Sequence, residues 1–313
     1  MWRTVAWLVL VAFTIAVWLA TFRAYGFAPD VQGSDAWNYL AAGERLNAGH
    51  PLYAISPGDR PIPLLPPYWT VPMLAPPPIA VAWRPVALLG DPAMTLWATA
   101  GLLVTLATAG WLLVRGGLVA TAIVAVMAAP LTLQSLAGNA NGFLFAGLVL
   151  AWVFRSRPIV AGSLVAATIA VKLTPALLLI WLATSGRWRA FGATFGALVV
   201  IGIVSLIGAG VQNHLDWLAS VPLSAPAPTS VAGLTGLPAV VVEAIAVVAV
   251  IVVALARDER LTFSAAVIAA ALASPALYLG TLGIAAAAAA PWLLPAGSFA
   301  ERFRSRPMSA RPA

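Results

Sequence analysis

Cysteine is absent from the sequence, histidine occurs twice and lysine only once. A chain without cysteine forms no disulfide, holds no thiolate nucleophile and offers no thiolate ligand to a metal ion. The two histidines, His50 and His214, are too few for a histidine-rich metal site. We therefore expect neither a bound metal ion nor another cofactor.

Charge is also scarce, since charged residues make up 9% of the chain and hydrophobic residues 62%. A soluble globular domain carries about 25% charged residues, and the mean hydropathy of +0.95 likewise places the chain among membrane proteins. The formal net charge is +7, but the arginines lie between hydrophobic runs, where membrane topology uses them. We therefore expect contact with membrane lipids and no nucleic acid partner.

The hydrophobic runs predict an all-α polytopic membrane protein with a single integral membrane domain, residues 1–313. A membrane-spanning helix needs about 20 apolar residues. The first run follows Arg3 and is interpreted as an uncleaved helix with a cytoplasmic N-terminus. The candidate spans outside the ambiguous region discussed next are 4–22, 93–114, 117–135, 140–154, 188–209, 238–256, 261–279 and 281–296.

Residues 158–186 contain one charge, Lys172, and are too long for a single upright span. A straight helix of this length would measure about 43 Å against a hydrocarbon core of about 30 Å, and Pro175 can break a helix. Two short helices, 158–171 and 173–186, would place 12 of the 17 basic residues on the side of the N-terminus. The positive-inside rule favours this hairpin, which gives about ten helical segments and cytoplasmic N- and C-termini.

Two long segments, 23–91 and 210–237, then lie outside the cell, and a basic tail, 297–313, lies in the cytoplasm. Six of the ten acidic residues fall in the two outside segments. We therefore expect a multi-pass protein of the cell membrane with its active site on the extracytoplasmic face. The sequence contains no internal repeat, so an inverted-repeat transporter is not supported.

The first outside segment contains "GSDAWNYLAAGERLNAGHPLY", residues 33–53, which predicts a helix over 34–48 at the outer membrane surface. Ser34 is a suitable N-cap, and Asp35 lies in the first turn, where the helix dipole favours an anion. Gly49, followed by His-Pro, ends the helix. Spacing alone leaves two interpretations of Asp35: a favourable first-turn acid or a functional carboxylate.

The same stretch resembles the first outside loop of glycosyltransferase family 87, the polyprenyl-phosphate-mannose-dependent alpha-mannosyltransferases. That loop contains an Asp, a Tyr four residues later and a Gly-x-x-Leu-Tyr ending. The family's Tyr-Pro-Pro motif is similar to "LAPPP" here, with alanine in place of the tyrosine. The matching residues of the loop are Asp35, Tyr39, Gly49, Leu52 and Tyr53, and further similar segments are "LAGNANGFLF" (136–145), "AVKLTPALLLIWLATSGRWRA" (170–190) and "LASPAL" (272–277).

The resemblance, which covers about two-thirds of the chain, implies a GT-C-type helical bundle with an active site at its outer face. It implies transfer of a hexose, mannose, from a polyprenyl-phosphate sugar donor to a glycolipid or polysaccharide acceptor, with inversion. Asp35 would then be the general base that takes a proton from the acceptor hydroxyl. Inversion needs one such base and no covalent intermediate, which agrees with the absence of a paired-carboxylate motif.

Lys172 and Arg45 are the candidate ligands of the donor phosphate. An ionisable residue within a hydrophobic segment is a functional hypothesis by default, and a lysine can meet a phosphate as a compact charge. The alternatives are that Lys172 snorkels to the membrane interface and that Arg45 binds lipid headgroups.

The candidate substrate-binding residues are polar or aromatic side chains of the outside segments. Asn139 and Asn141 open a helix at the outer surface and can hydrogen-bond sugar hydroxyls, with N-capping as the alternative. His214 lies in the second outside segment, where an ordinary solvated loop is the alternative. Tyr39 and Tyr53 are included because they match the family's loop.

Two other functions stay open. A lipid-phosphate transporter or flippase would line a path across the bilayer with charged groups, whereas charges here collect at one face. A non-catalytic membrane scaffold is compatible with the missing tyrosine before Pro-Pro. Asp35 and Lys172 argue against the scaffold.

Overall fold

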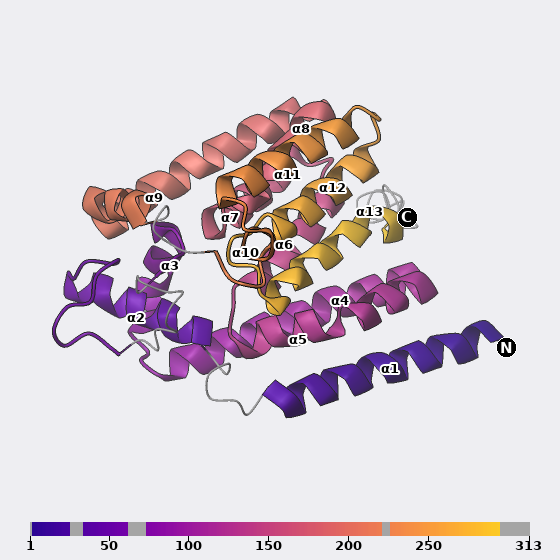
Figure 1. The fold of residues 1–313 in the computed structure, drawn as a ribbon, viewed down its shortest axis with the longest axis horizontal. Coiled ribbons are helices and arrows are strands. Elements are labelled where there is room, and N and C mark those ends of the chain that lie inside the picture. Colours follow the sequence, from indigo (N-terminus) through magenta and orange to yellow (C-terminus); the bar gives the residue numbers. More distant parts are fainter. Residues whose placement is uncertain (1, 26–33, 62–72, 221–225, 295–313) are drawn as a thin grey trace, which may run out of the picture.

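The computed structural model describes residues 2–25, 34–61, 73–220 and 226–294, and every regular element in these residues is a helix (Figure 1). The predicted all-α class is therefore confirmed. The tail at 297–313 lies outside the described residues.

The helices form an elongated bundle with a smaller helical layer at one end. α1 (Trp2–Tyr25) lies along α4 (Pro92–Val126) at one side of the bundle (Figure 1). α2 (Ser34–Ala48) and α3 (Pro77–Ala87) pack on each other and form the smaller layer. The rest of the bundle consists of α5 (Ala128–Leu136), α6 (Asn141–Val153), α7 (Pro158–Val171), η1 (Thr174–Leu177), α8 (Leu178–Thr184), α9 (Trp188–Ser220), α10 (Val231–Thr235), α11 (Ala239–Ala254), α12 (Glu259–Leu272), η3 (Leu279–Ala289) and α13 (Ala290–Leu293).

Aromatic side chains and many alanines fill the centre of the bundle. Trp152, Trp181 and Phe263 are buried, and Phe263 lies 5.1 Å and 4.8 Å from the two tryptophan rings, centroid to centroid. The outer surface is also apolar, because large aliphatic side chains of α9 such as Val199 and Ile207 are exposed. Exposed apolar surface of this extent favours contact with lipid, in agreement with a membrane protein.

Two helices, α4 and α9, are long and apolar enough to cross a membrane. The expectation of about ten membrane helices is not confirmed, since the other apolar stretches found in the described residues, Thr4–Val17 of α1 among them, are 10–17 residues long. α9 itself turns at Gly210, which adopts φ 76° and ψ 161°, a conformation that residues with a Cβ rarely adopt.

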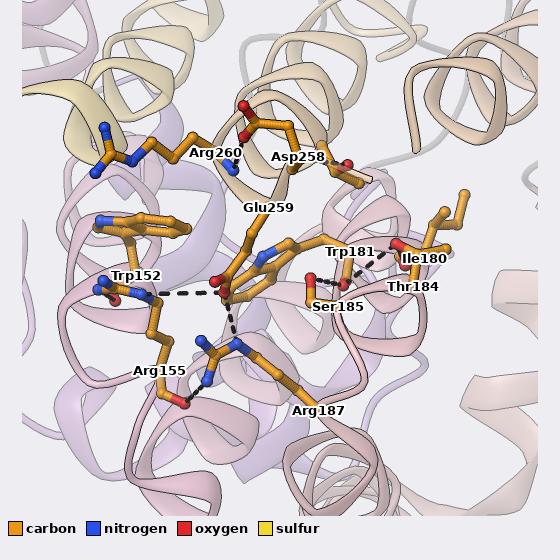
Figure 2. Close-up of polar contacts among 11 residues, drawn as sticks. Trp152, Arg155, Ile180, Trp181, Thr184, Ser185, Arg187, Asp258, Glu259 and Arg260 are labelled. Atoms are coloured by element: carbon orange, nitrogen blue, oxygen red, sulfur yellow. Dashed lines mark hydrogen bonds and ion pairs between the residues drawn. The ribbon is translucent and has the colours of Figure 1, made fainter. Parts of the chain in front are cut away.

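The predicted hairpin over 158–186 is present in the structure. α7 ends at Val171, Lys172 is extended, and the chain continues through η1 into α8. The two flanks of the hairpin meet, because the Arg187 guanidinium donates a hydrogen bond to the Arg155 carbonyl (Figure 2). Lys172 therefore lies at the tip of the hairpin, and both flanking arginines lie at its base.

Glu259 ties the base of this hairpin to α12, and we call this part of the molecule the Glu259 end. Its Oε1 accepts a hydrogen bond of 2.6 Å from Arg187 Nε and lies 4.0 Å from Arg155 Nε, as Figure 2 shows. The Arg155 guanidinium also lies 4.0 Å from the centre of the Trp152 ring. One carboxylate thus serves two part-buried guanidinium groups.

Replacing Glu259 by glutamine is expected to lower the free energy of unfolding by about 1–3 kcal/mol, because two part-buried cations lose their shared anion. The measurement is the midpoint of thermal unfolding of the purified protein in detergent. Glu243→Gln is the matched control, since Glu243 is exposed on α11 and forms no ion pair among the described residues. An equal midpoint for Glu259→Gln and the control would contradict this role.

Three regions differ from the sequence-based expectations. Residues 281–296 were expected to form a membrane helix, but the described part is a 3-10 helix, η3, followed by the short α13. The segment 210–237 was expected to be a loop, but α9 continues as a helix to Ser220 after its turn. α3 was not expected at all; its start at Pro77 uses proline in the first helical turn, where no amide donor is needed.

Candidate functional site

Asp35 lies in the first turn of α2, at the end of the bundle opposite Glu259, which we call the Asp35 end. The amides of Asp35 and Ala36 donate to the carbonyl of Ala137 at 3.0 and 3.4 Å. Asn139 Nδ2 donates to Asp35 Oδ2 at 2.8 Å. The first turn of α2 is therefore held against the segment between α5 and α6.

Gly138 makes this close approach possible. Its φ is 64°, and a Cβ at this position would lie 2.7 Å from the Cβ of Ala36. Both the left-handed backbone and the contact exclude an ordinary side chain. The carbonyl of Gly138 also accepts a hydrogen bond of 2.8 Å from Trp97 Nε1, which fixes the orientation of the segment.

The Asn139 amide has two partners with different roles. Its Nδ2 donates to Asp35, and its Oδ1 accepts a hydrogen bond of 2.9 Å from the amide of Asn141 at the start of α6. The bond to the Asn141 amide agrees with the capping interpretation of Asn139, and its role toward a sugar stays a prediction. Asn141 is buried, and its Oδ1 has no partner among the described residues.

Lys172 brings a positive charge toward Asp35 from the tip of the 158–186 hairpin. The two charges attract each other, but no ion pair joins them among the described residues. Both residues keep part of their surface accessible. Three segments that are far apart in the sequence therefore contribute Asp35, Asn139 and Lys172 to one place.

Burial raises the pKa of the Asp35 carboxyl above its ordinary value, while the hydrogen bond from Asn139 and the charge of Lys172 act in the opposite direction. A carboxylate with a raised pKa is a stronger proton acceptor once it is ionised. The environment of Asp35 therefore suits a group that takes up a proton during a reaction.

Tyr39 lies one turn after Asp35 and joins an aromatic cluster with Trp83, Trp97 and Phe143. Ring centroids in this cluster are 4.6–6.1 Å apart. Burial and the nearby Asp35 carboxylate raise the pKa of Tyr39, which keeps its hydroxyl protonated. The cluster packs α2 against α3, α4 and α6 and supports the position of Asp35.

The hydrogen bonds of Tyr53 and His214 in the described structure go to groups other than Asp35. The Tyr53 hydroxyl donates to the carbonyl of Ala75 at 2.8 Å. His214 lies within hydrogen-bond distance of Ser205 Oγ, at 2.9 Å, and of the Gly210 carbonyl, at 2.8 Å. Both ring nitrogens of His214 are therefore used at the turn of α9.

Arg45 occupies a separate position at the other end of α2. Ten residues separate it from Asp35, which corresponds to about 15 Å along a helix. The charges that act on it are those of the carboxylates Asp59 and Glu44, and not that of Lys172. Arg45 lines a cavity of about 520 Å³.

Two polar clusters beside α2 were not predicted from the sequence. Arg60 donates to both carboxylate oxygens of Glu44, at 2.7 and 2.8 Å, and to Asp91 at 2.7 Å. His50 Nδ1 lies 2.6 Å from Asp59 Oδ1. These contacts hold residues 50–61 against α2. In the sequence the partners show only opposite charges, because they are not spaced as neighbours on one helix would be.

No group of three or more metal-ligating side chains gathers in the described part of the chain. Asp35 has an amide and a lysine for neighbours, and no second carboxylate of the described residues acts on it. The site therefore offers a proton acceptor beside a cation, a combination that fits an anionic substrate with a hydroxyl to be deprotonated.

The comparisons with known proteins give one match. Residues 74–304, more than half of the chain, match the model of glycosyltransferase family 87. No curated protein and no solved structure matches the chain. The matched range includes Asn139 and Lys172 but begins after Asp35.

Proposed function

The chain belongs to glycosyltransferase family 87, and from this premise we propose that it moves a hexose, mannose, from polyprenyl phosphate to a lipid-linked or cell-envelope glycan with inversion. The observation that carries the proposal is the meeting of Asp35, Asn139 and Lys172 at the end of α2. The site would face the extracytoplasmic side of a multi-pass membrane protein whose two termini lie in the cytoplasm.

Asp35 acts as the general base in this proposal. The acceptor hydroxyl attacks the anomeric carbon, its proton passes to the Asp35 carboxylate, and the bond from the anomeric carbon to the phosphate oxygen breaks. The phosphate leaves as an anion, so no strong general acid is needed. The hydrogen bond from Asn139 to Oδ2 supports this role because it fixes the orientation of the carboxylate.

Lys172 binds the donor phosphate and neutralises the charge that develops as the phosphate leaves. Its position near Asp35, without a direct ion pair, supports this role because the sugar of the donor must lie between base and phosphate. A lysine that only snorkels would need no carboxylate nearby.

Replacing Asn139 by alanine is expected to move the acidic limb of the pH–rate profile to higher pH. The base must be ionised, so the rate falls as pH drops through the pKa of Asp35. The hydrogen bond from Asn139 lowers that pKa, and its loss raises it. The measurement is kcat/KM for transfer as a function of pH.

Asn47→Ala is the matched control for this profile, because Asn47 lies on the same helix and pairs with Arg84 instead. An acidic limb that stays in place in Asn139→Ala would mean that Asp35 is not the group that titrates.

The direct test of the proposed function supplies membranes containing the protein with radiolabelled sugars on polyprenyl phosphate and with total envelope lipids. The expected result is transfer of label from the mannose donor. Transfer from an arabinose or glucose donor alone would change the sugar and keep the reaction. No transfer from any donor above membranes that lack the protein would contradict the proposal.

A further inference from the structure

The Arg45 guanidinium is buried and has no hydrogen-bond partner among the residues that the structure describes. The residue is 1% exposed, and its Nε, Nη1 and Nη2 atoms have no partner in that part of the chain. A buried guanidinium normally pairs with carboxylate, phosphate or carbonyl oxygens, because removing a charge from water is costly. Within the described residues, Arg45 therefore lacks the anion that its side chain is suited to bind.

The acids around Arg45 are already engaged by other groups. Glu44 holds Arg60 through both of its carboxylate oxygens. Asp59 accepts from the Ser56 amide at 2.7 Å and lies 2.6 Å from His50 Nδ1. These acids attract Arg45 through space, but neither forms a hydrogen bond with it, so the three guanidinium nitrogens are unpartnered in the described part of the chain.

A cavity of about 520 Å³ lies beside these residues and is lined by Glu44, Arg45, Ala48, His50, Gly58, Asp59, Arg60 and Pro61. The other charged side chains that line the cavity are already paired with each other or with Asp91. An anion that enters the cavity would therefore bind to Arg45, the cation without a hydrogen-bond acceptor among the described residues. A guanidinium binds phosphate or carboxylate with two parallel hydrogen bonds.

The distance from Asp35 assigns this anion to the acceptor. A polyprenyl phosphate carries one phosphate, which must lie just beyond the sugar carbon that reacts beside Asp35. Arg45 lies about 15 Å further along α2, and its charge does not act on Asp35 or Lys172. A second anion at this distance belongs to the other substrate.

Asn38 provides a polar group between the two positions. It lies seven residues before Arg45, a spacing of two helical turns that places both on one face of α2. Asn38 is buried, and its Oδ1 has no partner among the described residues. A sugar hydroxyl of an acceptor that runs along α2 could donate to this oxygen.

We propose that the Arg45 cavity binds an anionic group, phosphate or carboxylate, of the acceptor, while the acceptor hydroxyl reaches Asp35. This inference rests on the proposed transferase function. It replaces the expectation that Arg45 shares the donor phosphate with Lys172.

The test begins with envelope lipids separated by anion exchange into an anionic and a neutral fraction. Acceptor activity is expected in the anionic fraction. Arg45→Met is expected to raise the apparent KM for this fraction about ten- to hundredfold, with the donor KM unchanged. Arg45→Lys is expected to recover part of the loss because it restores the charge.

Arg23→Met is the matched control, since Arg23 is exposed in the last turn of α1 and loses the same charge. Treating the anionic fraction with carbodiimide and methylamine separates the two anion chemistries. Acceptor activity that disappears identifies a carboxylate, and activity that remains identifies a phosphate. Acceptor activity confined to the neutral fraction, or a rise in donor KM in Arg45→Met, would overturn the proposal.

A binding measurement separates this inference from the proposed function. The anionic fraction is expected to raise the thermal unfolding midpoint of the wild-type protein and of Arg23→Met more than that of Arg45→Met. A smaller midpoint shift for Arg45→Met, found without any sugar transfer, would support the anion site and contradict the proposed transferase function. Sugar transfer by the wild type with equal midpoint shifts in all variants would contradict the anion site alone.

Discussion

Asp35→Asn is expected to lower kcat for sugar transfer by about 10²–10⁴-fold, the contribution of a positioned general base. Asparagine has the same shape as aspartate, and its side-chain oxygen can still accept the hydrogen bond from Asn139. The substitution therefore removes the proton acceptor and keeps the contact between α2 and the segment after α5. Initial rates at saturating donor and acceptor give the measurement.

The unfolding midpoint of Asp35→Asn shows whether the fold survives. Wild-type stability together with lost transfer would assign the loss to chemistry. Asp216→Asn is the matched control, because Asp216 accepts a hydrogen bond from Gln212 on the far part of α9. Turnover of Asp35→Asn close to that of the control would remove Asp35 from the catalytic role.

Lys172→Met is expected to raise the KM for the polyprenyl-phosphate donor about ten- to hundredfold, because a charge-assisted contact with the phosphate is lost. Methionine keeps most of the apolar length of the side chain, so the packing at the hairpin tip is retained. The KM for the acceptor should change little, which separates this residue from Arg45. Lys172→Arg keeps the charge and should retain part of the donor affinity.

The same substitution has a second expected effect that a snorkelling lysine would not produce. The charge of Lys172 lowers the pKa of Asp35, so its removal should move the acidic limb of the pH–rate profile to higher pH. A wild-type donor KM together with a wild-type pH profile would mean that Lys172 serves only the membrane interface.

The sequence predicts the local structure of the site well. The helix expected over 34–48 is present with those bounds, and it ends at Gly49 as expected, with the His50 amide bonded to the Arg45 carbonyl at 2.9 Å. The hairpin over 158–186 followed from the arginines that flank it. These features are local, or depend on membrane topology, and both leave a pattern in the sequence.

The contacts between segments could not be predicted in the same way. Hydrophobic periodicity does not show that Asn139 lies against Asp35 or that Lys172 approaches from a hairpin tip, because each contact depends on how the helices pack. The sequence predicts that the membrane span ends at residue 209, close to the turn of α9 at Gly210. It does not predict the helix beyond the turn, because polar residues there reduce the hydrophobic signal. That Arg45 has no partner among the described residues depends on side-chain contacts that charge alone does not reveal.

The central claim is that Asp35 is the base of a sugar transfer from polyprenyl phosphate. The most direct measurement supplies membranes with radiolabelled polyprenyl-phosphate mannose and total envelope lipids, and compares wild type with Asp35→Asn at equal protein content. Label that appears in a glycolipid with the wild type and not with Asp35→Asn is the predicted result. Equal labelling of the glycolipid by both proteins would contradict the claim.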